Sequence, residues 1–288
     1  MKAFYVKELV GLAALIGIFL VACNVTSVEA SIPTMPWSTT FDCAEQDQTS
    51  LGWPSCDGLV KSGDGWAVQP CAITSAANYS GGRGGRGTRS TWLANNGNSA
   101  SACGEPAFNL PGRQPELWAR WYQRYQPGWK ASAGIKNFYI GPPISQSGDA
   151  IYFNTLSDGL RTVANGTHIV QSVNNYFANE YGGGTTTSNG AWVCNETHWK
   201  VESTSGGTDA QIDWWMNGKL YLHSSNTTLG STVGYQYGSI PSNGETTGNP
   251  LAFYIDIDDI EISTTGRIGC LGGTDQTPPA APSNLRIQ

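Results

Sequence analysis

Charged residues are scarce in this 288-residue chain, since Asp, Glu, Lys and Arg make up 13% of it and the formal net charge is -6. Proteins that bind nucleic acid usually present a strongly basic surface, so this balance argues against a nucleic-acid partner. No Cys-x-x-Cys or Cys/His spacing typical of a zinc site occurs. Helical periodicity is nearly absent too, which argues against an α-helical fold.

The sequence is instead rich in turn-forming and aromatic residues, with 36 Gly, 11 Trp and 12 Tyr. Short β-branched and aromatic runs alternate with Gly, Ser, Thr and Asn turns, which is the pattern of a sandwich or barrel. We therefore predict an all-β fold, a two-sheet antiparallel β-sandwich of the jelly-roll kind. The length suits one large domain, because such domains often reach about 200 to 250 residues, although length alone also allows two.

An export signal is predicted at the N-terminus, where Lys2 and Lys7 accompany an apolar stretch over 9–22 that is short for a bilayer span. Two processing sites compete: the run Leu-Val-Ala before Cys23 resembles a bacterial lipobox, and 28–30 (Val-Glu-Ala) fits ordinary cleavage. We favour the lipobox. The expected product is an exported lipoprotein at the cell surface or outer membrane, otherwise a secreted protein, whose membrane contact would be that lipid anchor.

Of 7 cysteines, lipidation of Cys23 leaves an even set that can pair completely. In an oxidising compartment such a set indicates a disulfide framework, with many connectivities open. The pairs we expect are Cys43 with Cys56, Cys71 with Cys103, and Cys194 with Cys270.

The clearest strand is predicted from Glu116 to Tyr125, and Pro127-Gly128 ends it. Asn217-Gly218 is a strong signal for a type I′ hairpin. A β-bulge is expected at Asp258-Asp259, where the alternation of the last strand shifts. Further strands are predicted over 135–140, 150–154, 168–172, 192–203, 211–216, 219–222 and 251–263. The predicted organisation is a signal over 1–23, a linker over 24–36, the sandwich over 37–272 and a Pro-rich tail over 273–288.

Several segments in this order resemble bacterial secreted proteins of the concanavalin A-like (laminin G-like) superfamily. The main ones are Leu117-Trp118-Ala119-Arg120-Trp121-Tyr122, Trp214-Trp215-Met216-Asn217-Gly218 and Ile257-Asp258-Asp259-Ile260-Glu261-Ile262-Ser263. The superfamily includes lectins, glucanases and polysaccharide lyases, so the resemblance implies extracellular recognition of a polysaccharide or other glycan. Two alternatives stay open: a lyase that cleaves uronate-containing polymers by β-elimination, and a non-catalytic adhesion or surface-structural module.

Catalytic signatures of that superfamily are incomplete here. The Glu-x-Asp-x-x-Glu strand of laminarinase-like hydrolases is missing, and so is the Arg-x-Glu-x-Arg strand of alginate lyases. For a lyase, the candidate face is that of Arg120, Tyr122 and Arg124, because elimination needs cations that neutralise a carboxylate and a group that shuttles a proton. His198 and Lys200 could join them if their strand is adjacent. The competing interpretation is an ordinary polar strand face.

Substrate-binding candidates are of two kinds. A Gly-rich segment over 81–89 concentrates arginines that could contact an anionic sugar, or it is a solubilising loop. Aromatic side chains beside polar segments could stack on sugar rings, whereas most tryptophans of a sandwich lie in the core. The candidates are Arg83, Arg86, Arg89, Trp92, Trp129, Trp215 and Tyr181; His168 and His223 lack chemical partners nearby in sequence and are set aside.

A structural calcium ion is the one cofactor that the sequence suggests. Asp256 and Asp258 lie in the last strand, and Asp42 or Glu45 near the first strand could complete an oxygen-rich site. The alternative is that these aspartates form the hydrogen bonds of the turn and of the bulge.

Overall fold

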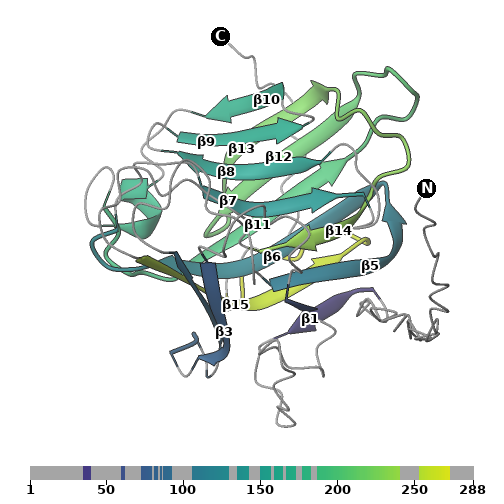
Figure 1. The fold of residues 1–288 in the computed structure, drawn as a ribbon. Helices are drawn as coiled ribbons and strands as arrows, with labels where there is room; N and C mark the ends of the chain where they lie inside the picture. Colours follow the sequence, from purple (N-terminus) through teal and green to yellow (C-terminus); the bar gives the residue numbers. More distant parts are fainter. Residues whose placement is uncertain are drawn as a thin grey trace, which may run out of the picture.

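The computed structural model describes residues 35–39, 60–61, 73–79, 81–83, 85, 87–92, 106–129, 135–142, 150–156, 159–164, 167–172, 177–182, 187–240 and 253–272. Two antiparallel sheets lie one over the other, as the ribbon in Figure 1 shows. Apart from the single-turn π-helix Phe177–Tyr181, the elements in this part of the chain are strands. The predicted all-β fold, a sandwich of two antiparallel sheets, is confirmed.

One sheet has eight strands in the described part of the chain. Its order is β13 (Lys219–Thr227), β12 (Ala210–Met216), β11 (Val193–Lys200), β6 (Glu116–Tyr125), β15 (Phe253–Ser263), β4 (Gly87–Trp92) and β3 (Ile73–Tyr79), and β1 (Trp37–Thr39) also pairs with β15. The other sheet has seven described strands, in the order β10 (Thr167–Ser172), β9 (Gly159–Ala164), β8 (Ile151–Leu156), β7 (Ile135–Gly141), β14 (Tyr235–Ser239), β5 (Pro106–Gln114) and β2 (Val60–Lys61).

Aromatic side chains join the two sheets. Phe138 of β7 lies 5.7 Å, between ring centroids, from both Trp121 of β6 and Trp199 of β11. Phe153 of β8 meets Trp214 of β12 edge-on at 5.7 Å. Each such pair contributes about 0.5–1.5 kcal/mol beyond the burial of apolar area. Because successive strand residues point to opposite faces, placing these rings between the sheets turns the intervening residues outward.

Local sequence signals locate several features correctly. β6 has the predicted bounds. Asn217 and Gly218 both have positive φ, 47° and 82°, as a type I′ turn requires, and Met216 pairs with Lys219. The register of β15 against β6 shifts between Asp258 and Glu261, which confirms the bulge.

Other strands carry weaker signals and escape prediction. β5 contains Pro111-Gly112, which reads as a turn. β4 begins at Gly87, inside the Gly-rich segment over 81–89 for which the sequence predicts no strand. β9 and β14 are only 6 and 5 residues long. Within the described residues, no helix is long and apolar enough to cross a membrane.

Candidate functional site

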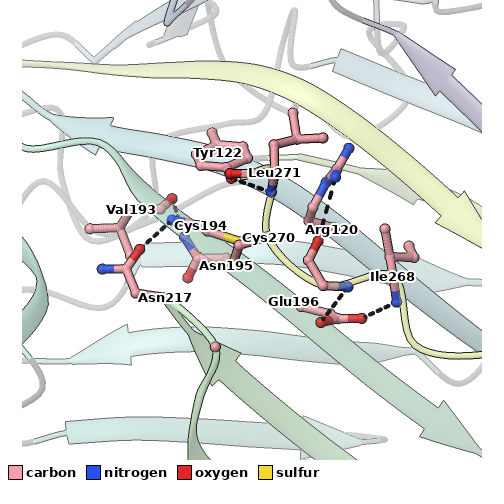
Figure 2. The surroundings of a disulfide bond; sticks show 12 residues. Arg120, Tyr122, Val193, Cys194, Asn195, Glu196, Asn217, Ile268, Cys270 and Leu271 are labelled. Atoms are coloured by element: carbon pink, nitrogen blue, oxygen red, sulfur yellow. Dashed lines mark hydrogen bonds between the residues drawn. A yellow bond between two sulfur atoms is a disulfide. The ribbon is translucent and has the colours of Figure 1, made fainter. Parts of the chain in front are cut away.

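Arg120 and Tyr122 lie on the outer face of the eight-stranded sheet, beneath a segment that follows β15. We call this segment, Arg267–Leu271, the strap (Figure 2). The Tyr122 hydroxyl accepts a hydrogen bond from the Leu271 amide at 2.7 Å, and Arg120 donates to the Gly269 carbonyl at 3.4 Å. The predicted Cys194–Cys270 disulfide is present and fixes the strap to β11. Both proposed catalytic side chains are therefore buried, with exposed fractions of 4% and 6%.

The predicted arginine candidates on this face form ion pairs with buried aspartates. Asp256 binds Arg89 at 2.6 Å and Arg124 at 2.7 Å. Arg83 pairs with Asp259 at 2.6 Å, and its backbone amide donates to Asp258. Arg83 and Arg89 thus attach the segment over 81–89 to β15, so it is not a free solubilising loop at these two positions. Arg86 lies outside the described residues.

A carboxylate between two histidines lies further along the same face. Asp213 on β12 contacts Nδ1 of His198 on β11 at 2.8 Å and Nδ1 of His223 on β13 at 2.5 Å. The strands β11 and β6 are adjacent, as the His198 hypothesis required, and His198 also contacts Glu116 at 3.1 Å. Lys200 is exposed and lies 3.8 Å from the Glu116 carboxylate.

The Asp213 cluster brings in His223, which sequence reasoning had set aside. Burial alone would raise the pKa of Asp213, but hydrogen bonds from His198, His223 and Gln211 outweigh burial and lower the pKa below its ordinary value of 3.8. An ionised carboxylate only accepts hydrogen bonds, so both imidazoles present Nδ1–H to it. This arrangement orients the two rings and leaves Asp213 charged across the neutral range.

Two of the proposed stacking residues are core residues instead, so that prediction is wrong for them. Tyr181 has no exposed surface, and Trp129 stacks on Tyr125 with ring centroids 4.1 Å apart. Trp215 is 7% exposed and lies beneath Arg267, with 4.7 Å between its ring centroid and the guanidinium carbon. Trp92 ends β4, but its side chain lies outside the described residues.

The calcium hypothesis involves side chains that already have partners. Asp256 binds the two arginines, and Asp258 accepts hydrogen bonds from the amides of Arg83 and Asp259. No group of three metal-binding side chains occurs within the described ranges. Asp42 and Glu45 fall outside those ranges, as do Cys23, Cys43, Cys56, Cys71 and Cys103, so the calcium site, the lipid anchor and the other disulfides stay predictions.

The outer face of the seven-stranded sheet carries a second candidate site, which we call the tyrosine cluster: Tyr139, Tyr152 and Tyr237. Tyr139 and Tyr152 are cross-strand partners whose ring centroids lie 5.3 Å apart, and Tyr237 approaches Tyr139 edge-on at 6.1 Å. The Lys136 ammonium lies 4.2 Å from the centroid of the Tyr152 ring. The cluster is separate from the core between the sheets.

Amide side chains border this cluster. Asn109 pairs in register with Tyr237, and Asn154 pairs with Lys136. The Oδ1 atoms of both asparagines are buried and have no hydrogen-bond partner among the described residues. Burial raises the pKa of Tyr139 and of Tyr152, so both phenols stay protonated through neutral pH. The site thus combines the half-buried Tyr152 and Lys136 with two buried rings and two asparagine oxygens that have no partner among the described residues.

The sequence contains only part of the signal for this site. Alternation alone places Tyr152 and Asn154 on one strand face. Lys136 and Tyr139 are three positions apart and would fall on opposite faces of a regular strand. A register shift between Lys136 and Phe138 moves them to the same face, and a bulge of this kind is invisible in the alternation.

No family profile matches the sequence, and no curated protein is significantly similar to it. Among solved structures, the chain is similar to the cellulose-induced protein Cip1, with 18% identity over 81% of this chain and 99% of that chain and a TM-score of 0.48. It is also similar to an endo-β-1,4-glucuronan lyase from the fungus Trichoderma reesei, with 15% identity over 70% and 92% and a TM-score of 0.46. A third is alginate lyase vAL-1 from a Chlorella virus, with 14% identity over 66% and 91% and a TM-score of 0.43.

Proposed function

We propose that this protein binds a polysaccharide on the outer face of its seven-stranded sheet, at the tyrosine cluster. The observation that carries the proposal is the grouping of Tyr139, Tyr152 and Tyr237 beside a cation and two unused acceptors. Sugar rings have apolar C–H faces that pack on aromatic rings, and their hydroxyl groups need acceptors. The half-buried Tyr152 is the ring that offers such a contact, and the buried Tyr139 and Tyr237 pack behind it. The asparagine oxygens offer those acceptors, and leaving them unpaired in a buried position would be costly.

The cation favours a polysaccharide that carries carboxylates. Lys136 is half-buried and lies beside Tyr152, so an anionic group there would meet a positive charge that is only partly screened by water. The opposite face of the molecule is less suited to this role. Arg83, Arg89 and Arg124 on that face are ion-paired. Arg120 and Tyr122 lie beneath the strap, whereas Tyr152 of the tyrosine cluster and the neighbouring Lys136 are half-buried.

The binding test compares purified wild-type protein with Tyr152→Ala and Lys136→Gln in affinity electrophoresis through gels containing alginate, polygalacturonate or neutral hydroxyethylcellulose. We expect retention on at least one acidic polymer. Tyr152→Ala should weaken retention by about tenfold or more, since a stacked ring contributes on the order of 1–2 kcal/mol. Lys136→Gln should weaken binding of the acidic polymers alone.

Tyr254→Ala serves as the matched control, because Tyr254 is a half-buried tyrosine of β15 that stacks with Arg89 on the opposite sheet. Retention of this variant should equal that of the wild type. Binding that survives Tyr152→Ala but not Tyr254→Ala would move the glycan site to the eight-stranded sheet and contradict the proposal.

A second candidate function, β-elimination, is favoured by the contact between Lys136 and Tyr152. In that reaction a water molecule accepts the C5 proton of a uronate, the C4–O bond breaks, a C4=C5 double bond forms, and the departing oxygen takes up a proton that the donor regains from solvent. The Lys136 ammonium would neutralise the uronate carboxylate, and the protonated Tyr152 hydroxyl would donate to the departing oxygen.

Tyr152→Phe separates cleavage from binding, because it keeps the ring and removes the hydroxyl. A lyase would release unsaturated products that absorb in the ultraviolet, and the variant should lose about 10²-fold or more in rate while retention changes little. Retention with no absorbing product from the wild type would leave recognition as the function and exclude the lyase on that polymer.

A further inference from the structure

The strap crosses β6 and β11 in a way that resembles a bound peptide (Figure 2). Its backbone supplies most of the contacts. The Ile268 and Gly269 amides donate to the Glu196 carboxylate at 2.7 and 3.2 Å, and the Leu271 amide donates to Tyr122. Side chains of the sheet thus bind the main chain of an extended segment. A disulfide from Cys270 links this segment covalently to Cys194 of β11.

Two charged side chains beneath the strap, those of Glu196 and Arg120, form hydrogen bonds with the strap and not with each other. They are cross-strand partners with opposite charges, yet no ion pair joins them. Glu196 is 1% exposed and accepts its hydrogen bonds from the strap. Arg120 pairs with Glu261 and with the Gly269 carbonyl, while its Nε is buried with no hydrogen-bond partner in the described structure. Buried charges are costly unless they are matched, so this face depends on an occupant.

Three groups surround the Arg267 side chain and form what we call the arginine slot, which makes this face specific for a segment that carries an arginine. The Arg267 guanidinium lies over the Trp215 ring, forms an ion pair with Glu196 at 3.1 Å and donates to the Gly218 carbonyl at 3.3 Å. An aromatic face, a buried carboxylate and a carbonyl together match the planar cation and its fixed donors. The Arg267 side chain is 7% exposed, so the slot encloses it.

We infer that the outer face of β6, β11 and β12 is a recognition site for an extended peptide that carries an arginine. In the disulfide form the strap of the same chain occupies the site. Reduction of Cys194–Cys270 frees the strap and opens the site to an arginine-bearing peptide of another molecule. This site is independent of the glycan site, which lies on the opposite sheet.

The opening step needs a dithiol reductant. One of its thiolates attacks the sulfur of Cys270, which is partly exposed, whereas Cys194 is 1% exposed. The second thiol then displaces Cys270. The dithiol loses two electrons and two protons as its own disulfide forms, and Cys194 and Cys270 gain them as two thiols.

The first test asks whether the disulfide keeps the strap in place, with hydrogen exchange measured on the full-length wild type and on Cys270→Ser. The Ile268, Gly269 and Leu271 amides should exchange at least about tenfold faster in the variant, because their partners hold them only while the strap is docked. Unchanged protection would show that the strap is a permanent part of the sheet and would overturn the opening step.

The second test asks whether the site binds a peptide from another molecule. The receptor is full-length Arg267→Ala/Cys270→Ser, whose own strap lacks the arginine and the covalent link. The probe is a fluorescent peptide with the sequence of residues 264–272 carrying Cys270→Ser. Fluorescence polarisation should show binding to the receptor and none to oxidised wild type. The same peptide with Arg267→Ala should bind at least about tenfold more weakly.

Glu196→Gln in the receptor should reduce peptide binding to the same extent, whereas Asp209→Asn, an exposed carboxylate beyond β11, should not. Near-ultraviolet circular dichroism and retention on the polysaccharide gel check that each receptor is folded. A folded receptor that fails to bind the peptide, or that binds the arginine and alanine peptides equally, would overturn the proposed site. Neither result would affect the glycan proposal.

Discussion

At the residue scale, Asp213 shows how one buried carboxylate organises its neighbours. It accepts hydrogen bonds from His198, His223 and Gln211, each on the outer face of the eight-stranded sheet. Trp118 stacks on the His198 ring with centroids 4.3 Å apart. The orientation of His198 is therefore held by a hydrogen bond in the plane of its ring and by a stacked ring on its face. These interactions are stronger while Asp213 is ionised, because a carboxylate accepts stronger hydrogen bonds than a neutral carboxyl group.

This dependence predicts a loss of stability in acid. Because the folded-state pKa of Asp213 is lower than the ordinary value of 3.8, its contribution is fully present above about pH 3.8 and is lost as pH falls through the folded pKa. Urea unfolding of the wild type and Asp213→Asn at a series of pH values should show a stability difference that is constant near pH 6 and shrinks below pH 3.8. A difference that grew in acid would contradict this assignment.

Gly141 makes room for the tyrosine cluster. A Cβ built on this residue would meet the Tyr139 hydroxyl, so the absence of a side chain allows the ring to lie over β7. Gly141→Ala should displace Tyr139, lower the free energy of unfolding by about 1–3 kcal/mol and weaken polysaccharide retention. Gly112→Ala is the matched control on β5, because a Cβ there meets nothing within 4 Å, and its effect should stay within about 0.5 kcal/mol. Equal effects of the two changes would contradict this role.

At the element scale, bulges decide which residues meet. Beyond the turn at Asn217-Gly218, an uninterrupted hairpin would pair Asp213 with Leu222. A register shift between Trp214 and Trp215 pairs Asp213 with His223 instead. The register shift in β7 likewise brings Lys136 and Tyr139 to the same face of that strand. Alternation along the sequence therefore gives the strands but not these partners.

The hairpin turn itself gives a further prediction. Asn217 has a φ of 47° and also accepts a hydrogen bond from the Cys194 amide at 3.0 Å. Asn217→Gly loses the hydrogen bond but keeps the backbone conformation, whereas Asn217→Val loses both. Urea unfolding should find the valine variant less stable than the glycine variant by about 1–2 kcal/mol. Equal stabilities would mean that the turn conformation costs valine nothing.

At the scale of the whole molecule, the Cys194–Cys270 disulfide closes a segment with a sequence separation of 76. The link restricts the unfolded chain, so Cys194→Ala/Cys270→Ala should lower the free energy of unfolding by about 2–4 kcal/mol. Domains are typically stable by about 5–15 kcal/mol, so the variant should remain folded. Guanidinium denaturation measures the difference, and an unchanged midpoint would contradict the expected contribution.

Local signals in alternation, turn chemistry or cysteine count predict the fold class, the strand β6, the hairpin turn, the bulge at Asp258-Asp259 and one disulfide. The packing of the strands and of the strap settles which polar side chains are accessible. Tyr122 and Arg120 lie beneath the strap, and Tyr181 lies in the core. The packing of the strands also assembles the tyrosine cluster from β7, β8 and β14. Such outcomes depend on register shifts and on contacts between residues far apart in the chain, which a strand's own sequence does not contain.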